Sequence, residues 1–352
     1  MTQKPLLALT IVLAVFFVMG CGNQQQPAVS KVNIPAEKLN PYQPLPDIVI
    51  SENNPLTPEK IELGRMLYFD KRLSKSHEFS CNSCHDLKTY GVDNSPVSTG
   101  HKNQTGTRNS PTVYNAAGHI AQFWDGRAMD VEEQAKGPVL NPVEMGMPSE
   151  ARVVKTLQSM PGYVDAFRKA FPDEPNPITF DNMAKAIGAF ERKLITPSRW
   201  DEFLNGKETA ITDEEKNGFI KFVEVGCVAC HNGPYLGGNA FQKLGLINNW
   251  PGNEDPGRLL ATHNELDEDK FKVASLRNVE KTAPYLHDGS IADLETAVKM
   301  MAEYQLDQNL SDEDSKAIVS FLKSLTGKLP EAYIQEPTLP ESTPDTPLPE
   351  MD

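Results

Sequence analysis

Two Cys-x-x-Cys-His motifs constrain this chain of 352 residues more than any other feature of it. Their residues are Cys81, Cys84 and His85 in the first motif and Cys227, Cys230 and His231 in the second. This spacing suits covalent attachment of a c-type haem, in which two thiols bond the vinyl groups and the adjacent histidine binds the iron. A zinc site would need further cysteines or closely spaced histidines, and none is nearby. A redox dithiol would not require a histidine after each second cysteine. The sequence therefore predicts two covalently bound haems.

The fifth cysteine, Cys21, follows a leader with one basic residue, Lys4, and a largely apolar run over residues 6–19. This run is shorter than the roughly 18 apolar residues that a membrane span needs, and it is typical of a signal peptide. Residues 18–21, Val-Met-Gly-Cys, resemble a bacterial lipoprotein box, in which cleavage leaves a lipidated cysteine. An uncleaved anchor and ordinary secretion are the alternatives. We expect residues 1–20 to be a signal peptide and the protein to lie in the periplasm, anchored to a membrane only through lipid on Cys21.

The formal net charge of −14 at pH 7 limits the partners of the protein. It argues against nucleic acid and against an anionic membrane surface. It is compatible with a basic electron-transfer protein such as a small cytochrome c.

Helical patterns surround both motifs. Thr57-Pro58 predicts a helix start, and apolar residues recur with helical spacing over residues 153–160 and 180–194. Capping patterns predict three further starts, at Thr212, Ser290 and Ser311. Residues 89–111 are rich in Gly, Ser, Asn and Thr and predict a long loop, and no stretch indicates a long strand.

The predicted fold is all-α, with two cytochrome c-like domains that each carry one covalently bound c-type haem. The expected ranges are a polar tether and lead-in segment at 21–56, domains at 57–203 and 204–328, and an acidic, Pro-rich tail at 329–352. On its composition the tail is predicted to be disordered.

The second axial ligand of each iron decides between electron transfer and chemistry on oxygen species. Beyond His231 the candidates are Met300 and Met301, of which only one can face the iron, because neighbouring helical residues point about 100° apart. Beyond His85 the candidates are His101, His119, Met145 and Met147. His101 lies in the Gly-rich loop, where a ligand could be released at little structural cost.

Two other residues could take part in the chemistry. Glu144 has mostly apolar neighbours in sequence, and a partly desolvated carboxylate can move a proton between the oxygens of a peroxide. The alternative is a solvated or ion-paired glutamate. Trp124 could relay electrons between the haems or fill the core.

Residues 81–325 closely resemble the bacterial dihaem cytochrome c peroxidases. The matching segments are Gly91-Val-Asp-Asn, Arg108-Asn-Ser-Pro-Thr-Val-Tyr-Asn, Gln122-Phe-Trp-Asp-Gly-Arg-Ala, Ala135-Lys-Gly-Pro-Val, Leu157-x-Ser-Met-Pro-Gly-Tyr and Thr282-Ala-Pro-Tyr-Leu-His-Asp-Gly. They fall in both predicted domains.

The resemblance implies a role for each candidate. His85 and His101 would bind the iron of a low-potential haem, where peroxide reacts, and His231 and Met301 that of a high-potential haem. Glu144 would be the catalytic acid/base, and Trp124 would lie between the haems. A calcium ion would be bound at the domain interface by the Asn109 side chain and the carbonyls of Thr282 and Pro284.

The implied function is periplasmic reduction of hydrogen peroxide to water with electrons from a reduced small cytochrome c or a cupredoxin. In many relatives reduction of the high-potential haem detaches the counterpart of His101, whereas others need no such activation. The resemblance also implies a homodimer. Two other functions compete. Relatives that modify tryptophans of a partner protein carry Tyr where Met301 stands, and a dihaem carrier or peroxide sensor would need neither Glu144 nor a releasable His101.

Overall fold

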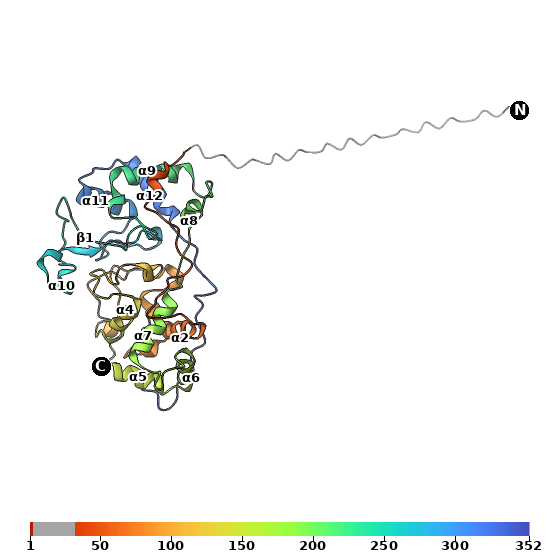
Figure 1. Cartoon of the computed structure of the whole chain (residues 1–352), viewed down its shortest axis with the longest axis vertical. Coiled ribbons are helices and arrows are strands. Elements are labelled where there is room, and N and C mark those ends of the chain that lie inside the picture. Colours follow the sequence, from red (N-terminus) through yellow and green to blue (C-terminus); the bar gives the residue numbers. More distant parts are fainter. Residues whose placement is uncertain (3–31, 352) are drawn as a thin grey trace.

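The structure is a computed structural model and describes residues 1–2 and 32–351. Cys21 and most of the predicted signal peptide lie outside the described residues. Figure 1 shows two helix-rich bodies stacked along the long axis of the molecule. We call them the first body, which holds helices α2 to α7, and the second body, which holds α8 to α12. The dominance of helix agrees with the all-α prediction.

The helices of the first body are α2 (Pro58–Phe69), α3 (Cys81–Cys84), α4 (Val131–Leu140), α5 (Glu150–Gln158), α6 (Pro161–Ala170) and α7 (Phe180–Glu191). The second body contains α8 (Arg199–Leu204), α9 (Asp213–Val225), α10 (Leu259–Thr262), α11 (Leu294–Leu306) and α12 (Asp312–Ser324), and α1 (Ala36–Leu39) precedes both bodies in the chain. Strands β1 (Phe241–Lys243) and β2 (Lys270–Lys272) pair antiparallel, with Phe241 opposite Lys272. Short 3-10 turns are η1 (Lys71–Leu73), η2 (Leu87–Thr89), η3 (His101–Asn103), η4 (Ala116–Gly118), η5 (Cys227–Ala229), η6 (Glu265–Asp267) and η7 (Val279–Lys281).

In the first body, α2 packs closely against α7. The predicted start of α2 is confirmed, because the Thr57 side chain accepts a hydrogen bond from the Lys60 backbone N–H. Gly64 lies where a Cβ would overlap the carbonyl oxygen of Ala186, so the absence of a side chain sets the distance between the two helices. Leu63 and Leu67 are fully buried on the same side of α2.

The second body repeats this arrangement with α9 against α12, where a Cβ on Gly218 would overlap the Ala317 carbonyl. Its core is aromatic: Trp200 lies 4.9 Å from Phe219 and 5.2 Å from Phe321 between ring centroids. Such clusters supply much of the apolar area that a small domain buries.

Two of the three capping predictions in this body are confirmed and one is wrong. Thr212 forms a full capping box at the start of α9, and Ser311 caps α12. Helix α11, however, begins at Leu294 with Asp293 as its cap. The backbone N–H of Ser290 instead binds the Asp288 side chain, so Ser290 belongs to the preceding turn.

Residues 34–42 and residues 333–334 each pack against the body that lies farther away in sequence. Ile34 and Tyr42 are buried in the core of the second body, although they fall in the predicted polar tether. Ile334 is 2% exposed in the core of the first body, beside Tyr333. The structure therefore differs from the prediction of a disordered tail over residues 329–351. That prediction rested on the content of proline and acidic residues. Such composition does not reveal that a single apolar residue such as Ile334 is buried in the core of the first body.

The boundary between the bodies also differs from the predicted one after residue 203. Trp200 and Phe203 on α8 lie in the core of the second body, so α8 belongs to that body. Within the described part of the chain, no helix has the length and apolar character needed to span a bilayer.

Replacing Gly64 with alanine should destabilise the protein by about 1–3 kcal/mol, because the new methyl group would push α2 away from α7. Helix propensity alone would predict the opposite sign, a gain of roughly 0.5–1 kcal/mol. Chemical denaturation of the haem-loaded protein measures the change. Glu62→Ala, on the exposed side of the same helix, should stay within about 0.5 kcal/mol of the parent. A stabilised Gly64→Ala variant would contradict the packing argument.

Candidate functional site

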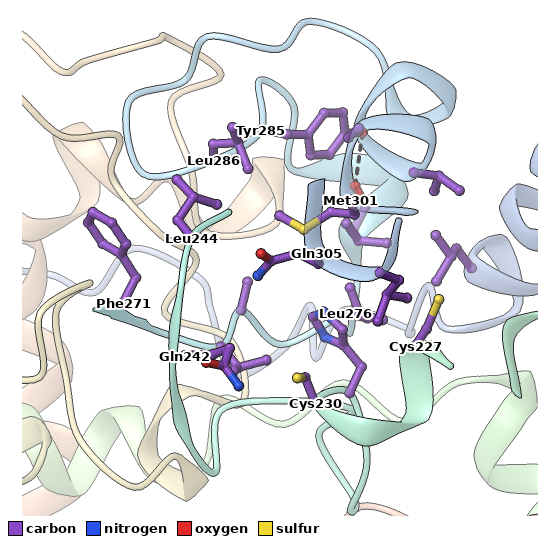
Figure 2. A pocket seen from close by; sticks show the side chains of 18 of the residues that line it. Cys227, Cys230, Gln242, Leu244, Phe271, Leu276, Tyr285, Leu286, Met301 and Gln305 are labelled. Atoms are coloured by element: carbon purple, nitrogen blue, oxygen red, sulfur yellow. Dashed lines mark hydrogen bonds between the residues drawn. The ribbon is translucent and has the colours of Figure 1, made fainter. Parts of the chain in front are cut away.

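A large apolar cavity in the second body is built around the second Cys-x-x-Cys-His motif (Figure 2). It encloses about 1280 Å³ including its open mouth. Cys227 follows Gly226, whose φ of 103° ends helix α9 and turns the chain toward the cavity. Figure 2 shows Met301 and Gln305 projecting into the cavity from the side opposite Cys230. The apolar lining includes Phe222, Leu244, Phe271, Leu276, Leu294 and Val298.

A hydrogen bond to the backbone of Leu236 orients the ring of His231. Its Nδ1 lies 3.2 Å from the carbonyl oxygen of Leu236, and since a carbonyl only accepts, Nδ1 carries the proton. Desolvation lowers the pKa of His231, which favours the neutral ring. Nε2 is then left as a basic nitrogen, the arrangement typical of a histidine that binds a metal.

The structure distinguishes between the two adjacent methionines on α11. Met301 lines the cavity, whereas Met300 is not among its lining residues. Met301 therefore shares the cavity with Cys227, Cys230 and His231.

A second cavity, of about 780 Å³ including its mouth, lies in the first body around Cys81, Cys84 and His85. Ser80 caps the short helix α3 that carries the two cysteines. Burial raises the pKa of the Cys84 thiol to about 11 and that of Cys81 further, so unreacted thiols would be protonated. Desolvation lowers the pKa of His85. The remaining lining includes Phe79, Val113, Gln134, Pro138, Glu144, Ile187 and Glu191.

Glu144 brings a carboxyl group into this first-body cavity. Burial raises its pKa above the ordinary carboxyl value, while the positive charge of Arg127 and a hydrogen bond from the Asn141 amide lower it. The Asn141 amide nitrogen lies 2.7 Å from Glu144 Oε1 and holds the carboxyl in one orientation. Such a partly desolvated, oriented carboxyl group is suited to proton transfer.

His101 lies beside this cavity but is not among its lining residues. Its backbone N–H donates to the Glu144 carbonyl at 2.8 Å, and its ring packs against Gly146, where a Cβ would come within 3.0 Å of it. The residue is 4% exposed, and neither ring nitrogen has a hydrogen-bond partner among the described residues. An imidazole left in this way is an exception among buried polar groups and needs an explanation.

The other candidates for the second ligand lie in different places. Met145 lines the cavity beside Glu144, while Met147 is buried in the core of the first body. His119 packs against the ring of Tyr235 and against Gly238, both in the second body. This position removes His119 from the first-body cavity.

Trp124 lies where the two bodies meet. Its indole N–H donates to the Asn109 carbonyl at 2.9 Å, and its own carbonyl accepts from the Lys272 N–H at 2.7 Å. Trp124 lines the second-body cavity, while Arg108, next to Asn109 in the chain, lines the first-body cavity. The tryptophan is therefore linked to the linings of both cavities.

Sequence reasoning missed two charged groups at these cavities. Glu191 is buried against the first-body cavity, and burial, together with the nearby charge of Glu132, raises its pKa to about 8. Arg108 bridges the bodies through ion pairs with Asp125 at 2.6 Å and Asp255 at 2.7 Å. The only indication in the sequence that Glu191 is buried is its position directly after Phe190 in the predicted helix. Nothing in the sequence indicated the pairing of Arg108 with Asp255.

The predicted calcium ligands lie on adjoining loops. The Asn109 backbone N–H donates to the His287 carbonyl at 2.6 Å, which brings the loop of Asn109 against the loop that contains Thr282 and Pro284. The Asn109 amide nitrogen donates to the Ser95 carbonyl. No group of three or more His, Cys, Asp or Glu residues suited to a metal ion is found within the described ranges. Calcium binding stays a prediction.

Comparisons with known proteins agree with this geometry. Residues 58–209 match the family model for di-haem cytochrome c peroxidase. The chain is 48% identical to the cytochrome c551 peroxidase of Pseudomonas aeruginosa, covering 88% of this chain and 90% of that protein. The chain belongs to the dihaem cytochrome c peroxidase family. The cytochrome c551 peroxidase of Nitrosomonas europaea is 45% identical, covering 85% of this chain and 91% of the relative.

Among solved structures, a MauG-like protein associated with microbial copper homeostasis is similar with a TM-score of 0.74 at 28% identity. The match covers 83% of this chain and 97% of that one. This protein is accordingly a dihaem peroxidase, and membership of the family implies two c-type haems.

The two cavities of this dihaem peroxidase fit such groups. Each combines a pair of unbridged cysteines with an adjacent histidine, and each has an apolar wall large enough for a macrocycle. They differ in their remaining polar groups. A thioether faces the motif in the second body, whereas a carboxyl group shares the cavity with the motif in the first body.

Replacing Gly100 with alanine should lower peroxidase turnover by about tenfold or more, because a methyl group there would overlap the Val143 carbonyl and displace the loop from Glu144. The assay is peroxide-dependent oxidation of reduced cytochrome c at steady state. Thr105→Ala on the same loop is the control, since Thr105 is exposed and does not line the cavity. Equal turnover of the two variants would contradict the argument.

Proposed function

We propose that this peroxidase reduces hydrogen peroxide to water in the periplasm, with electrons from a reduced small cytochrome c or a cupredoxin. The asymmetry between the two cavities carries the proposal. Glu144 shares the first-body cavity with the first motif, whereas Met301 faces the second motif from α11. Peroxide would react in the first-body cavity, and donor electrons would enter through the other.

When bound, the two haems would supply the iron that stores electrons and, in the first body, the iron at which peroxide is reduced. The protein residues bind, orient and move protons. His85 and His231 would bind the irons as proximal ligands, and Met301 would complete coordination in the second body, where a thioether raises the reduction potential. Glu144, held by Asn141, would take a proton from one peroxide oxygen and return it to the other.

Trp124 would carry electrons between the two sites. The indole N–H binds the Asn109 carbonyl and the Trp124 carbonyl binds the N–H of Lys272 on β2, so Trp124 is held between a loop next to the first-body cavity and a strand that lines the other. The reading of Trp124 as ordinary core is less well supported, because the residue is only half-buried and lines a cavity.

His101 would be a releasable second ligand of the first-body iron. One feature supports this role: its buried ring has no hydrogen-bond partner among the described residues. A position beside the cavity, rather than in its lining, suits a ligand that alternates between two arrangements. Comparing activity with and without prior ascorbate reduction of one haem tests whether release is required.

Three further features belong to the same proposal. Calcium would be bound by the Asn109 side chain and the carbonyls of Thr282 and Pro284, and the contact of their loops supports it. A lipid on Cys21 would anchor the protein, as the sequence of residues 18–21 suggests. The family resemblance suggests a homodimer.

Glu144→Gln should reduce peroxide turnover by at least about a hundredfold, because the amide cannot shuttle the proton. Absorption spectra of both haems should stay unchanged, since neither motif is altered. Asp181→Asn, which affects an exposed carboxylate on α7, is the control and should retain full turnover. Retained turnover in Glu144→Gln would remove Glu144 from the mechanism. An inactive parent with both haems loaded would instead favour an electron carrier or a peroxide sensor.

The adjacent methionines provide a second matched pair. Met301→Ala should lower the reduction potential of the haem in the second body, because the iron would lose its thioether ligand. Met300→Ala should leave the potential nearly unchanged, since Met300 does not line the cavity. Potentiometric titration of both variants measures the difference. A larger shift in Met300→Ala would assign the ligand to the other methionine.

A further inference from the structure

The tail, residues 329–351, follows the surface of the first body and is held at several points. The ring of Tyr333 stacks on Phe190 with centroids 5.0 Å apart, and its hydroxyl donates to the Phe190 carbonyl. Pro340 lies against Gly162, where a Cβ would come within 2.8 Å of it. Thr346 is buried and binds the Ser159 hydroxyl at 2.9 Å. These contacts hold the tail against the first body as far as residue 346.

Residues 348–350 are then held by the Arg152 side chain and by the Lys75 backbone. Arg152 donates to the Leu348 carbonyl at 3.4 Å and to Glu350 Oε1 at 2.6 Å. The backbone N–H of Glu350 donates to the Lys75 carbonyl at 2.9 Å. Arg152 lies in the first turn of α5, so the tail joins the start of that helix to the loop of Lys75.

Lys75 connects this contact to the segment that carries Glu144. Its backbone N–H donates to the Met145 carbonyl at 2.8 Å, next to Glu144 in the chain. The Glu144 carbonyl in turn accepts the N–H of His101 at 2.8 Å. A continuous series of backbone hydrogen bonds therefore runs from Glu350 through Lys75 to the segment that carries Glu144 and His101.

We propose that residues 348–350 are a positioning strap for the peroxide site. By holding Lys75 from outside, they fix the Met145 carbonyl and so the relative placement of Glu144 and His101. The functional part of this inference rests on the roles proposed above for those two residues.

The exposure of the strap contacts favours positioning over general stabilisation. The Arg152 and Glu350 side chains are 27% and 45% exposed, and ion pairs at that exposure contribute little to global stability. The backbone N–H of Glu350 nevertheless binds Lys75, whose own N–H binds the carbonyl of Met145, next to Glu144. Loss of the strap should therefore loosen this segment while the rest of the fold remains intact.

The test deletes residues 348–352 from the haem-loaded protein and follows hydrogen–deuterium exchange by mass spectrometry. We expect exchange to rise about tenfold in peptides that contain the Lys75 and His101 amides, with no change in α9 or α12. Turnover should fall several-fold with little change in KM for peroxide, and the high-spin share of the first-body haem spectrum should change. Arg152→Ala should reproduce these effects, and Arg152→Lys should restore part of them.

Gln335→Ala is the matched control, because it removes an exposed side-chain hydrogen bond of the tail, to the Glu331 carbonyl, that lies far along the chain from residues 348–350. It should leave exchange, spectrum and turnover unchanged. Unchanged exchange at Lys75 and His101 after deletion would overturn the strap. Faster exchange at Lys75 alone, with the His101 amide, spectrum and turnover unaffected, would overturn it too, because it would show a purely local anchor. The exchange result does not depend on the chemistry of Glu144, so failure of the proposed function would be seen separately.

Discussion

Two glycines allow helices to pack backbone against backbone, and each haem cavity is bounded by one of these helix pairs. Gly64 allows α2 to lie against the backbone of α7, and Gly218 does the same for α9 and α12. Each contact fixes a helix pair beside a Cys-x-x-Cys-His motif: α7 contributes Ile187 and Glu191 to one cavity, and α12 contributes Ile318 and Leu322 to the other. Once such a pair is locked, the apolar walls of the cavity have little freedom, because protein interiors are close-packed and resist small changes in volume.

Polar contacts and two further glycines between the bodies then fix the position of one cavity relative to the other. Arg108 pairs with one acidic residue from each side, Asp125 and Asp255. Gly118 and Gly238 allow Tyr235 and His119 to cross the boundary closely. Removing one partner of a charged pair that is largely shielded from water leaves an uncompensated charge, which is costly. The interface therefore favours one relative arrangement, with Trp124 between the two linings.

Much of the site could be predicted from sequence, because its signals are local. The haem motifs, the caps at Thr57 and Thr212 and the loop position of His101 depend on residues close together in the chain. Ser290 failed because the same short pattern also occurs in turns. The choice of Met301 over Met300 needed either the family resemblance or the helix orientation.

What could not be predicted comes from pairing across long distances in sequence. Arg108 and Asp255 are 147 residues apart, and no local pattern indicates that they meet. The burial of Glu191 depends on the other walls of its cavity. The tail was misjudged because its composition is that of a disordered segment, while a few residues such as Ile334 and Thr346 are enough to hold it on a preformed surface.

The crossing of the chain ends has a consequence for biogenesis. Tyr42 completes the core of the second body, and Tyr333 and Ile334 complete that of the first. During synthesis, residues 58–191 of the first body emerge well before Tyr333 and Ile334, which complete their core. A haem added at Cys81 and Cys84 would therefore meet a body whose core is still open, and Tyr333 and Ile334 would close that core afterwards.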